Sequence, residues 1–179
     1  MATSSSRGAE VEPPGSLHSP PPKGAVGGAG RPSAADLQTG AVDHLLGYLL
    51  ALAEVPTRRA FQQHVGQPFD LRPVEFSLLV LLLANGQAAP KQIGRVLRLP
   101  APHVTTLVNR LVERGVVERG RDPRDGRAVC VTLSAPGQAL AEQLRAVSLT
   151  MESSVQAVLT PAERTTLKRL LQKLARAPG

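Results

Sequence analysis

The stretch "APHVTTLVNRLVERGVVERGRDPRDGRAVCVTLS", residues 101–134, changes its hydrophobic period halfway along. In residues 101–115 apolar side chains recur at i, i+3, i+4 and i+7, which predicts a helix with one buried face that Gly115 ends. Residues 116–121 and 128–133 predict two short strands, with Val129, Val131 and Leu133 alternating inward. The stretch therefore predicts a helix followed by an antiparallel β-hairpin. The buried helical positions are Val104, Leu107, Val108 and Leu111.

The tip of this hairpin, "RGRDPRDGR" (119–127), holds four arginines and two aspartates. Pro123 and Gly126 suit a turn. By itself a turn of mixed charge is most often a solvated surface, but a turn does not need four guanidinium groups. Arginine is the side chain that enters a narrow, negative minor groove of DNA, and Asp125 can orient Arg127 by a charge-assisted contact.

Two further helices precede the stretch. Residues 72–86 predict a buried helix with Pro73 in its first turn and Asn85-Gly86 at its end. Residues 90–99 predict a short amphipathic helix that directs Ile93, Val96 and Leu97 inward. A helix, a short helix, a third helix and a hairpin, in this order, are the layout of a winged helix-turn-helix. In that setting the arginine-rich tip is favoured as a nucleic-acid contact over a plain surface turn.

The third helix carries short polar side chains opposite its apolar stripe, at about 100° per residue. Hydroxyl, amide and guanidinium groups of this kind can hydrogen-bond base edges in a major groove. Arg119, Arg121 and Arg124 are expected to contact phosphates or the minor groove. The predicted DNA-contacting residues are Pro102, His103, Thr105, Thr106, Asn109, Arg110, Arg121, Arg124, Asp125 and Arg127.

The charge distribution agrees with a polyanionic partner. The chain has a formal net charge of +7, and residues 91–127 contain nine Lys or Arg against four Asp or Glu. These bases are spread over two helices and a turn, which suits grooved DNA better than the single basic face of a membrane-binding helix. The longest apolar run, 78–84, is shorter than the about 20 residues that span a bilayer. Because Cys130 has no second cysteine to pair with and no signal peptide is visible, we expect a cytoplasmic protein without a membrane partner.

From Asp36 onwards a helical pattern is apolar on two faces. A helix of this kind must be covered on both sides, and in a small protein the second cover is often another subunit. Pro56 either breaks this helix or starts the next one, 56–66, which Gly66 closes. One face comprises Leu37, Ala41, Leu45, Tyr48, Leu49 and Leu52, and the other Val42, Leu46 and Leu50.

The C-terminal part is helical as well. Thr160, Pro161 and Glu163 form a capping box that opens a last helix. Before it, apolar residues at steps of three or four form a seam suited to packing along another helix. The seam comprises Leu140, Leu144, Val147, Met151, Val155 and Val158, and the last helix carries Leu167, Leu170, Leu171 and Leu174.

Residues 71–137 resemble the core of the multiple-antibiotic-resistance regulator (MarR) family. The resemblance includes "LVERGVVER" (111–119), "DPRDGR" (122–127) and "VTLSAPG" (131–137). It implies a bacterial homodimeric transcriptional regulator, with repression favoured over activation, whose N- and C-terminal helices form a dimerisation lobe. Each winged domain would bind half of a pseudo-palindromic operator in double-stranded DNA. The family's Asp-x-Arg pair maps onto Asp125 and Arg127, and its recognition face onto Pro102 through Arg110.

The resemblance has one local departure. Family members usually begin the recognition helix with Ser or Asp, whereas this chain has "PAP" at 100–102. The missing N-cap costs about 1 kcal/mol of helix stability. The same residues also leave a surface poor in hydrogen-bond donors at the end of the helix nearest the bases. We therefore expect base specificity to depend on His103, Thr106, Asn109 and DNA shape.

Members of the family commonly respond to small phenolic or anionic effectors in a cleft between the two lobes, and others to oxidants through a cysteine. A redox role is not favoured here, because Cys130 lies in a wing strand, where we expect it to point opposite to Val129 and Val131. The candidate effector-binding residues are His44, Tyr48, Phe61, His64, Phe69 and Phe76.

Other classes of protein fit less well. The sequence has no glycine-rich phosphate loop, no GxSxG motif and no metal-ligand spacing among its four histidines, so no enzyme, cofactor or metal site is predicted. Two alternatives remain. One is a winged helix that binds only proteins, which would not need Arg124 and Arg127. The other is a dimeric winged-helix regulator of a neighbouring family without ligand sensing.

The predicted fold is mainly α with a small antiparallel β-hairpin wing. Residues 1–33, rich in Ser, Pro, Gly and Ala, are expected to be a disordered tail. Residues 34–66 and 135–179 are expected to form the dimerisation helices, and residues 67–134 the winged helix-turn-helix domain.

Overall fold

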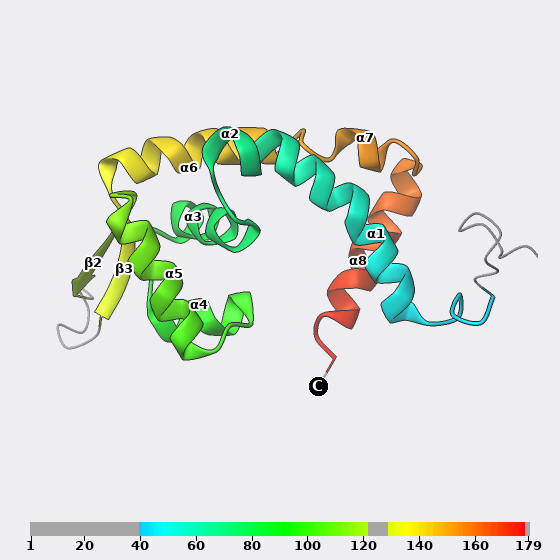
Figure 1. The fold of residues 1–179 in the computed structure, drawn as a ribbon, viewed down its shortest axis with the longest axis horizontal. Coiled ribbons are helices and arrows are strands. Elements are labelled where there is room, and N and C mark those ends of the chain that lie inside the picture. The colour runs from blue at the N-terminus through cyan, green and yellow to red at the C-terminus, as the bar shows by residue number, and fades with distance from the viewer. Residues whose placement is uncertain (1–39, 122–128, 178–179) are drawn as a thin grey trace, which may run out of the picture. The chain divides into compact units, whose positions relative to one another are not determined.

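The structure, a computed structural model, describes residues 40–121 and 129–177. The predicted tail (1–33) and the wing-tip residues Arg124, Asp125 and Arg127 lie outside this range. No helix in the described ranges is both long and apolar enough to cross a membrane. In chain order the elements are α1 (Leu46–Phe61), the π-helical turn η2 (Gln62–Gly66), α2 (Gln67–Phe69), α3 (Pro73–Asn85), β1 (Gln87–Ala88), α4 (Pro90–Leu97), α5 (Ala101–Glu113), β2 (Val117–Arg121), β3 (Val129–Leu133), α6 (Ala135–Ser148), α7 (Ser153–Gln156) and α8 (Pro161–Leu174) (Figure 1).

The first helix differs from its prediction at both ends. Residues 40–44 form a turn, and α1 begins only at Leu46. Pro56 lies inside α1 and does not end it, because a proline removes one backbone hydrogen bond and the rest of the helix can continue around it. Gly66 does not close the helical run either. The run continues through η2 and α2 and ends where Asp70 adopts a left-handed conformation with φ 48°.

The three helices before the hairpin form as predicted. Gly86 follows α3 with φ 76°, and Gly115 follows the C-cap residue of α5 with φ 69°, both positive φ values that glycine adopts without the strain of a Cβ. The stripe predicted on α5 is buried at all four positions: Val104, Leu107, Val108 and Leu111. These side chains share one core with leucines of α3 and with Ile93 of α4.

The prediction that Val96 of α4 points inward is wrong. Val96 was predicted to point inward with Ile93, yet its side chain is 61% exposed whereas that of Ile93 is buried. At about 100° per residue Val96 lies some 60° from Ile93 around the helix axis, at the edge of the apolar face. An eight-residue helix covers too little of the core to bury that edge.

The sheet has three strands where the sequence predicted two. β1 pairs antiparallel with β3, Gln87 opposite Thr132 and Ala88 opposite Val131. β2 pairs with the other edge of β3, giving the order β1-β3-β2. A two-residue strand is too short to show a period of two, so the sequence carries no signal for β1.

The alternation along β3 is also partly wrong. Val131 is completely buried, but Val129 is 52% exposed because it pairs with Arg121 at the far end of the hairpin, beyond the core. Cys130, on the opposite face, is buried. Cys130 pairs with Gly120 on β2. A Cβ added to Gly120 would lie 3.6 Å from the cysteine Sγ, so the thiol occupies the space beside the glycine at ordinary contact distance.

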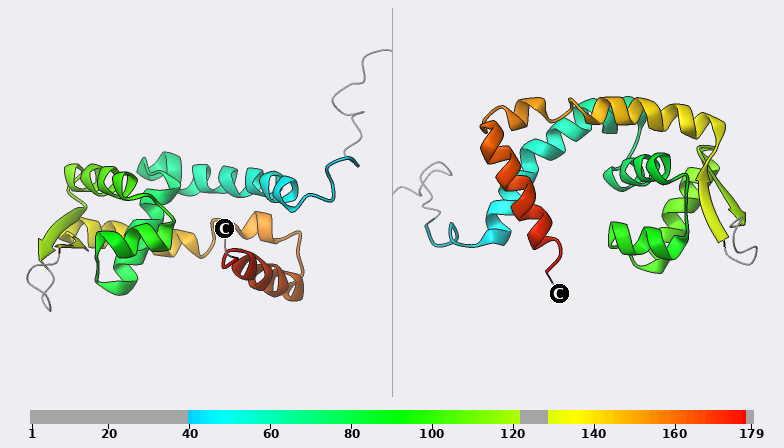
Figure 2. Two further views of the ribbon diagram at one scale, coloured as in Figure 1. Left: turned by 90° about the horizontal axis from the view of Figure 1, so that it is seen from below. Right: turned by 180° about the vertical axis from the view of Figure 1, so that it is seen from behind.

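The apolar seam predicted for residues 140–158 is distributed over more than one helix, and its two halves differ in burial. α6 packs against α3, as two views show, and buries Leu144 (Figures 1 and 2). Leu140, Val147 and Met151 pack against the same core, but Val158 is 82% exposed. The first half of the seam therefore packs within the chain. The helix also ends at Ser148, so the seam does not run along one continuous helix.

The capping box of α8 is confirmed. The Thr160 N–H donates to Glu163 Oε2 at 2.8 Å, and the Glu163 N–H donates to Thr160 Oγ1 at 3.3 Å. The Glu163 carboxylate accepts hydrogen bonds from the Thr160 N–H and the Thr160 hydroxyl, each at 2.8 Å, and these lower its pKa below the ordinary value.

Candidate nucleic-acid interface

Helix α5 presents a polar exposed face. Pro102, His103, Thr105, Thr106 and Asn109 are all exposed on it. The hydroxyls of Thr105 and Thr106 donate to the carbonyls of Ala101 and Pro102, each at 3.1 Å. Their hydrogens are therefore engaged within the helix, and the threonines offer acceptor lone pairs and methyl groups to a ligand.

The start of α5 agrees with the departure noted in the sequence. Pro100 is the N-cap residue, and no side chain caps the helix there. The first exposed side chains of the helix are therefore apolar or imidazole groups rather than a hydroxyl or carboxylate.

Arg110 is placed differently from the rest of its predicted group. Its Nε lies 3.0 Å from Glu75 Oε1, and its side chain is only one-third exposed. Glu75 in α3 is almost completely buried, and its other carboxylate oxygen accepts the Arg72 N–H at 2.8 Å. The Arg110 guanidinium is therefore paired with α3, although Arg110 also lines a hollow with His103 and Thr106 of the polar face.

The wing and the recognition helix are linked by side chains. The Arg119 guanidinium in β2 donates a hydrogen bond to Asn109 Oδ1 in α5. This bond uses the acceptor of the Asn109 amide, so its NH₂ group remains to donate to a base or phosphate. Arg121 is exposed at the end of β2, the last described residue before the wing tip.

Two basic side chains on α4 were included in the net charge of residues 91–127 but were not predicted to contact DNA. Lys91 and Arg95, one helical turn apart, are exposed and line a hollow of about 460 Å³ between α4 and α5. Thr105 lines the same hollow. Their i, i+4 spacing on the first helix of the motif is the signal that would have identified them.

The structure brings together only part of the predicted effector group. Phe61 and Phe76 meet edge to face, with ring centroids 5.7 Å apart and planes at 75°. Phe61 also lines a cavity of about 470 Å³ with Arg58 and Met151 among its neighbours. Of the other four residues, Phe69 is half-buried and packs against the core that contains Phe61, Tyr48 is half-buried, and His44 and His64 are exposed.

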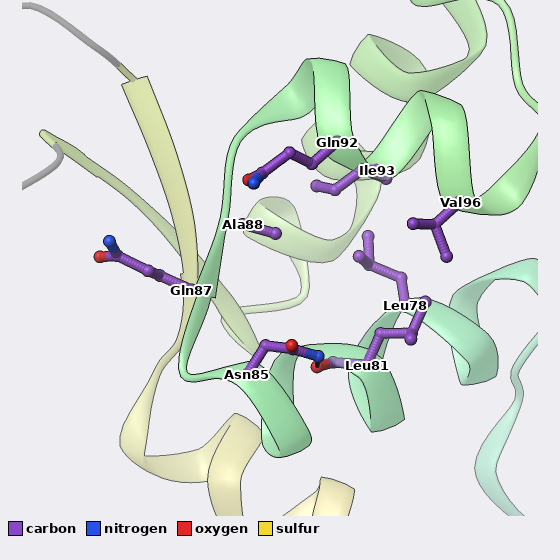
Figure 3. Close-up of a pocket in the computed structure, with 8 residues that line it drawn as sticks. All are labelled: Leu78, Leu81, Asn85, Gln87, Ala88, Gln92, Ile93 and Val96. Carbon is purple, nitrogen blue, oxygen red and sulfur yellow. Dashed lines mark hydrogen bonds between the residues drawn. The ribbon is translucent and has the colours of Figure 1, made fainter.

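A smaller cavity, of about 160 Å³, lies between the end of α3, β1 and α4 (Figure 3). Leu78, Leu81, Ile93 and Val96 converge on it, while the Gln87 amide points away (Figure 3). None of the lining residues carries a formal charge. This site therefore offers nothing to pair with an anion. Within the described ranges no cluster of three or more His, Cys, Asp or Glu could hold a metal ion.

The three helices, the antiparallel sheet and the polar outer face of α5 define a winged helix-turn-helix DNA-binding protein. A sequence model described as "MarR family" matches residues 69–128. The chain is 30% identical over 132 residues to the HTH-type transcriptional repressor Rv2887 of Mycobacterium tuberculosis, covering 74% of this chain and 94% of that protein.

Solved structures agree. A mutant of MarR from Escherichia coli in complex with operator DNA is 27% identical, with a TM-score of 0.67 over 77% of this chain and 99% of that one. Bordetella bronchiseptica BpsR, whose DNA binding is regulated by 6-hydroxynicotinic acid, is 27% identical, with a TM-score of 0.66 over 75% and 96%. The chain belongs to the MarR family of transcriptional regulators.

Proposed function

We propose that this protein is a homodimeric repressor that binds an inverted-repeat operator and is released by a small phenolic or anionic effector. The recognition helix α5 enters the major groove, and the arginines of the wing enter the neighbouring minor groove. The observation that carries the proposal is the exposed polar face of α5 beside a β-hairpin with arginines along it. The E. coli relative bound to operator DNA supports it.

The DNA-contacting residues are proposed in two groups. Pro102, His103, Thr105, Thr106 and Asn109 face the bases. On the wing Arg121, Arg124 and Arg127 contact the backbone and the minor groove, with Asp125 orienting Arg127. Lys91 and Arg95 add phosphate contacts from α4.

Dimerisation is supported by apolar surface on the helices at both ends of the chain. In α8 the leucines at i, i+3, i+4 and i+7 are 40–46% exposed, and α8 has no buried residue. Such contiguous apolar surface marks an interaction site. We assign residues 34–66 and 135–179 to the dimerisation lobe and propose a second copy of this chain as the partner. On α1 and just before it the exposed apolar residues are Leu45, Leu46, Leu49, Leu50, Leu52 and Val55.

Repression is proposed because the mycobacterial relative is named a repressor, and effector release because BpsR is regulated by a small hydroxylated acid. The cavity beside Phe61 is the proposed effector site, since it combines an aromatic ring with the Arg58 guanidinium. Glu54, which pairs with Arg58 at 2.5 Å, and Glu152 line it as well, so the lining favours a phenolic effector over an anionic one. Of the six predicted effector residues Phe61 lines this cavity, and Phe76 contacts Phe61.

The test starts with selection of bound duplexes from a random library. We expect an inverted repeat of about 16–20 bp whose half-sites are about one helical turn apart. Arg127→Ala should weaken binding to all duplexes and lower the salt slope of log K by about one, because one phosphate-type contact is lost. Asn109→Ala should instead change which bases are selected, since a base contact carries the sequence preference.

Fluorescence anisotropy at several salt concentrations measures both effects. If Arg127→Ala binds the selected duplex as tightly as wild type at matched salt, the wing does not contact DNA. A chain that selects no duplex at low ionic strength would contradict DNA binding itself and favour a protein-binding winged helix.

A further inference from the structure

Two arginines at the C-terminal end of α5 contact a segment far earlier in the chain, residues 69–75. Arg110 in α5 and Arg114, the C-cap residue one helical turn later, both reach the segment from the end of α2 to the first turn of α3, residues 69–75. This segment joins the helical run of α1, η2 and α2 to the first helix of the winged domain.

The Arg110 contact is with a buried acid. Glu75 is 1% exposed, accepts the Arg72 N–H through Oε2 and faces Arg110 Nε through Oε1 at 3.0 Å. A carboxylate removed from water needs a partner of opposite charge, and Arg110 supplies it. The positive charge of Arg110 is therefore largely neutralised within the protein.

Arg114 contacts mainly backbone, together with the Asp70 carboxylate, whose Oδ2 lies 3.9 Å from Arg114 Nη1. Its guanidinium donates to the carbonyls of Asp70, at 2.5 Å, and Phe69, at 3.0 Å. These carbonyls end α2, where Asp70 turns into the left-handed conformation. A planar guanidinium with several donors can hold two such acceptors in a fixed geometry.

We propose that Arg110 and Arg114 are positioning residues that hold the recognition helix against residues 69–75, from the end of α2 to the first turn of α3, and that Arg110 does not contact DNA. Arg110 sets the angle of α5 through Glu75, and Arg114 sets its C-terminal end through the carbonyls of residues 69 and 70. This inference rests on the proposed DNA binding, and it revises the assignment of Arg110 made from the sequence.

The two roles of Arg110 predict opposite results for its partner. If Arg110 contacted a phosphate, Glu75→Gln would remove a competing negative charge and leave DNA binding unchanged or tighter. If Arg110 positions α5, the same substitution loosens the helix and weakens binding only to the duplex that requires an exact fit. Glutamine keeps an oxygen for the Arg72 N–H, so the start of α3 remains capped.

The experiment compares wild type, Glu75→Gln, Arg110→Ala and the double variant by anisotropy. The probes are the duplex selected by wild type and an unrelated duplex at low salt. We expect each single variant to bind the selected duplex about tenfold more weakly, the loss typical of one mismatched base pair. The unrelated duplex should be bound as before, and the salt slope should not change. The double variant should be no weaker than the weaker single variant, because both remove one interaction.

Arg121→Ala is the matched control, since this exposed wing arginine should lower the salt slope by about one. Arg110→Ala behaving like Arg121→Ala would overturn the proposal, as would Glu75→Gln binding the selected duplex like wild type. If Arg110→Ala fails to fold, Glu75→Gln alone decides between the two roles. Wild type selecting no duplex would mark failure of the proposed function, and this inference would fall with it.

Discussion

Gly137 lies in the first turn of α6, at the point where that helix passes the start of the wing. A Cβ built on it would lie 1.8 Å from the Val116 carbonyl oxygen, far inside contact distance and against backbone that cannot rotate away. Its N–H donates to Ser134 Oγ at 3.1 Å, and the Ser134 hydroxyl donates to the Gly115 carbonyl at 2.6 Å. A glycine and a buried serine thus join the C-terminal helix to the end of the recognition helix.

Gly137→Ala should lower the free energy of unfolding by about 3 kcal/mol, the upper end of the cost of adding an atom to packed interior. Chemical denaturation measures the loss. Gly120→Ala is the control, because a Cβ there meets Cys130 Sγ at an ordinary 3.6 Å, and its effect should stay within about 0.5 kcal/mol. Equal stability of the two variants would mean that α6 does not approach Val116 as closely as described.

The contact of Arg110 with Glu75 could not be predicted from the residues adjacent to Arg110 in the sequence. Helical spacing places Arg110 one turn after Thr106, on the edge of the polar face, and this led to its prediction as a base contact. Its partner Glu75 is 35 positions earlier, on another helix. Nothing in the local pattern of either residue signals the pair.

At the scale of single elements, local rules succeed where the element makes its own contacts. The box at Thr160 and Glu163 forms as predicted because both partners lie within one helical turn. The run through Pro56 shows the opposite case. A proline lowers helix stability locally, but burial of Ala60 and Phe61 in the following turn holds the helix together across it.

The same box predicts a pH dependence for α8. The pKa of Glu163 is lowered in the folded state, so its charge stabilises the helix above the ordinary glutamate pKa, and this contribution is lost as pH falls through the folded value. Glu163→Gln keeps an acceptor for the Thr160 N–H but has no charge. Amide exchange of residues 161–174 should be faster in Glu163→Gln than in wild type at neutral pH. The difference should vanish as pH falls below the ordinary glutamate pKa and through the lowered folded value. A difference that persists at the acid end would assign it to side-chain shape instead of charge.

At the scale of the whole molecule, the described chain leaves much apolar surface on α1 and α8 while its winged domain has a closed core. Leu79, Leu111 and Val131 are completely buried in that core, and Val65 of η2 and Leu144 of α6, outside residues 67–134, complete it. Helices α1 and α8 keep leucines 40–61% exposed. We expect this contrast when one domain buries its core within a single chain and the second domain buries its apolar surface only against another copy of the chain.

Leu171→Glu should therefore convert the dimer to monomer, because it places a charge inside the proposed apolar interface. Sedimentation velocity measures the change. Gln172→Glu adds the same charge at the neighbouring exposed position and should leave the dimer intact. If both variants sediment like wild type and wild type is a monomer, the dimerisation lobe is wrongly assigned.

The amino-acid pattern was sufficient to predict the three helices of the motif, the hairpin, the turn glycines Gly86 and Gly115, and the polar face of α5. Each of these depends on a period or a cap within a few residues, which is all that a local pattern can encode. Other features became visible only in the folded chain: β1 joins the sheet, Val129 and Val96 are exposed, α1 passes through Pro56, and Arg110 and Arg114 contact residues 69–75. These features depend on which distant surfaces meet, because a side chain is buried, paired or free according to neighbours that the folded chain alone brings near.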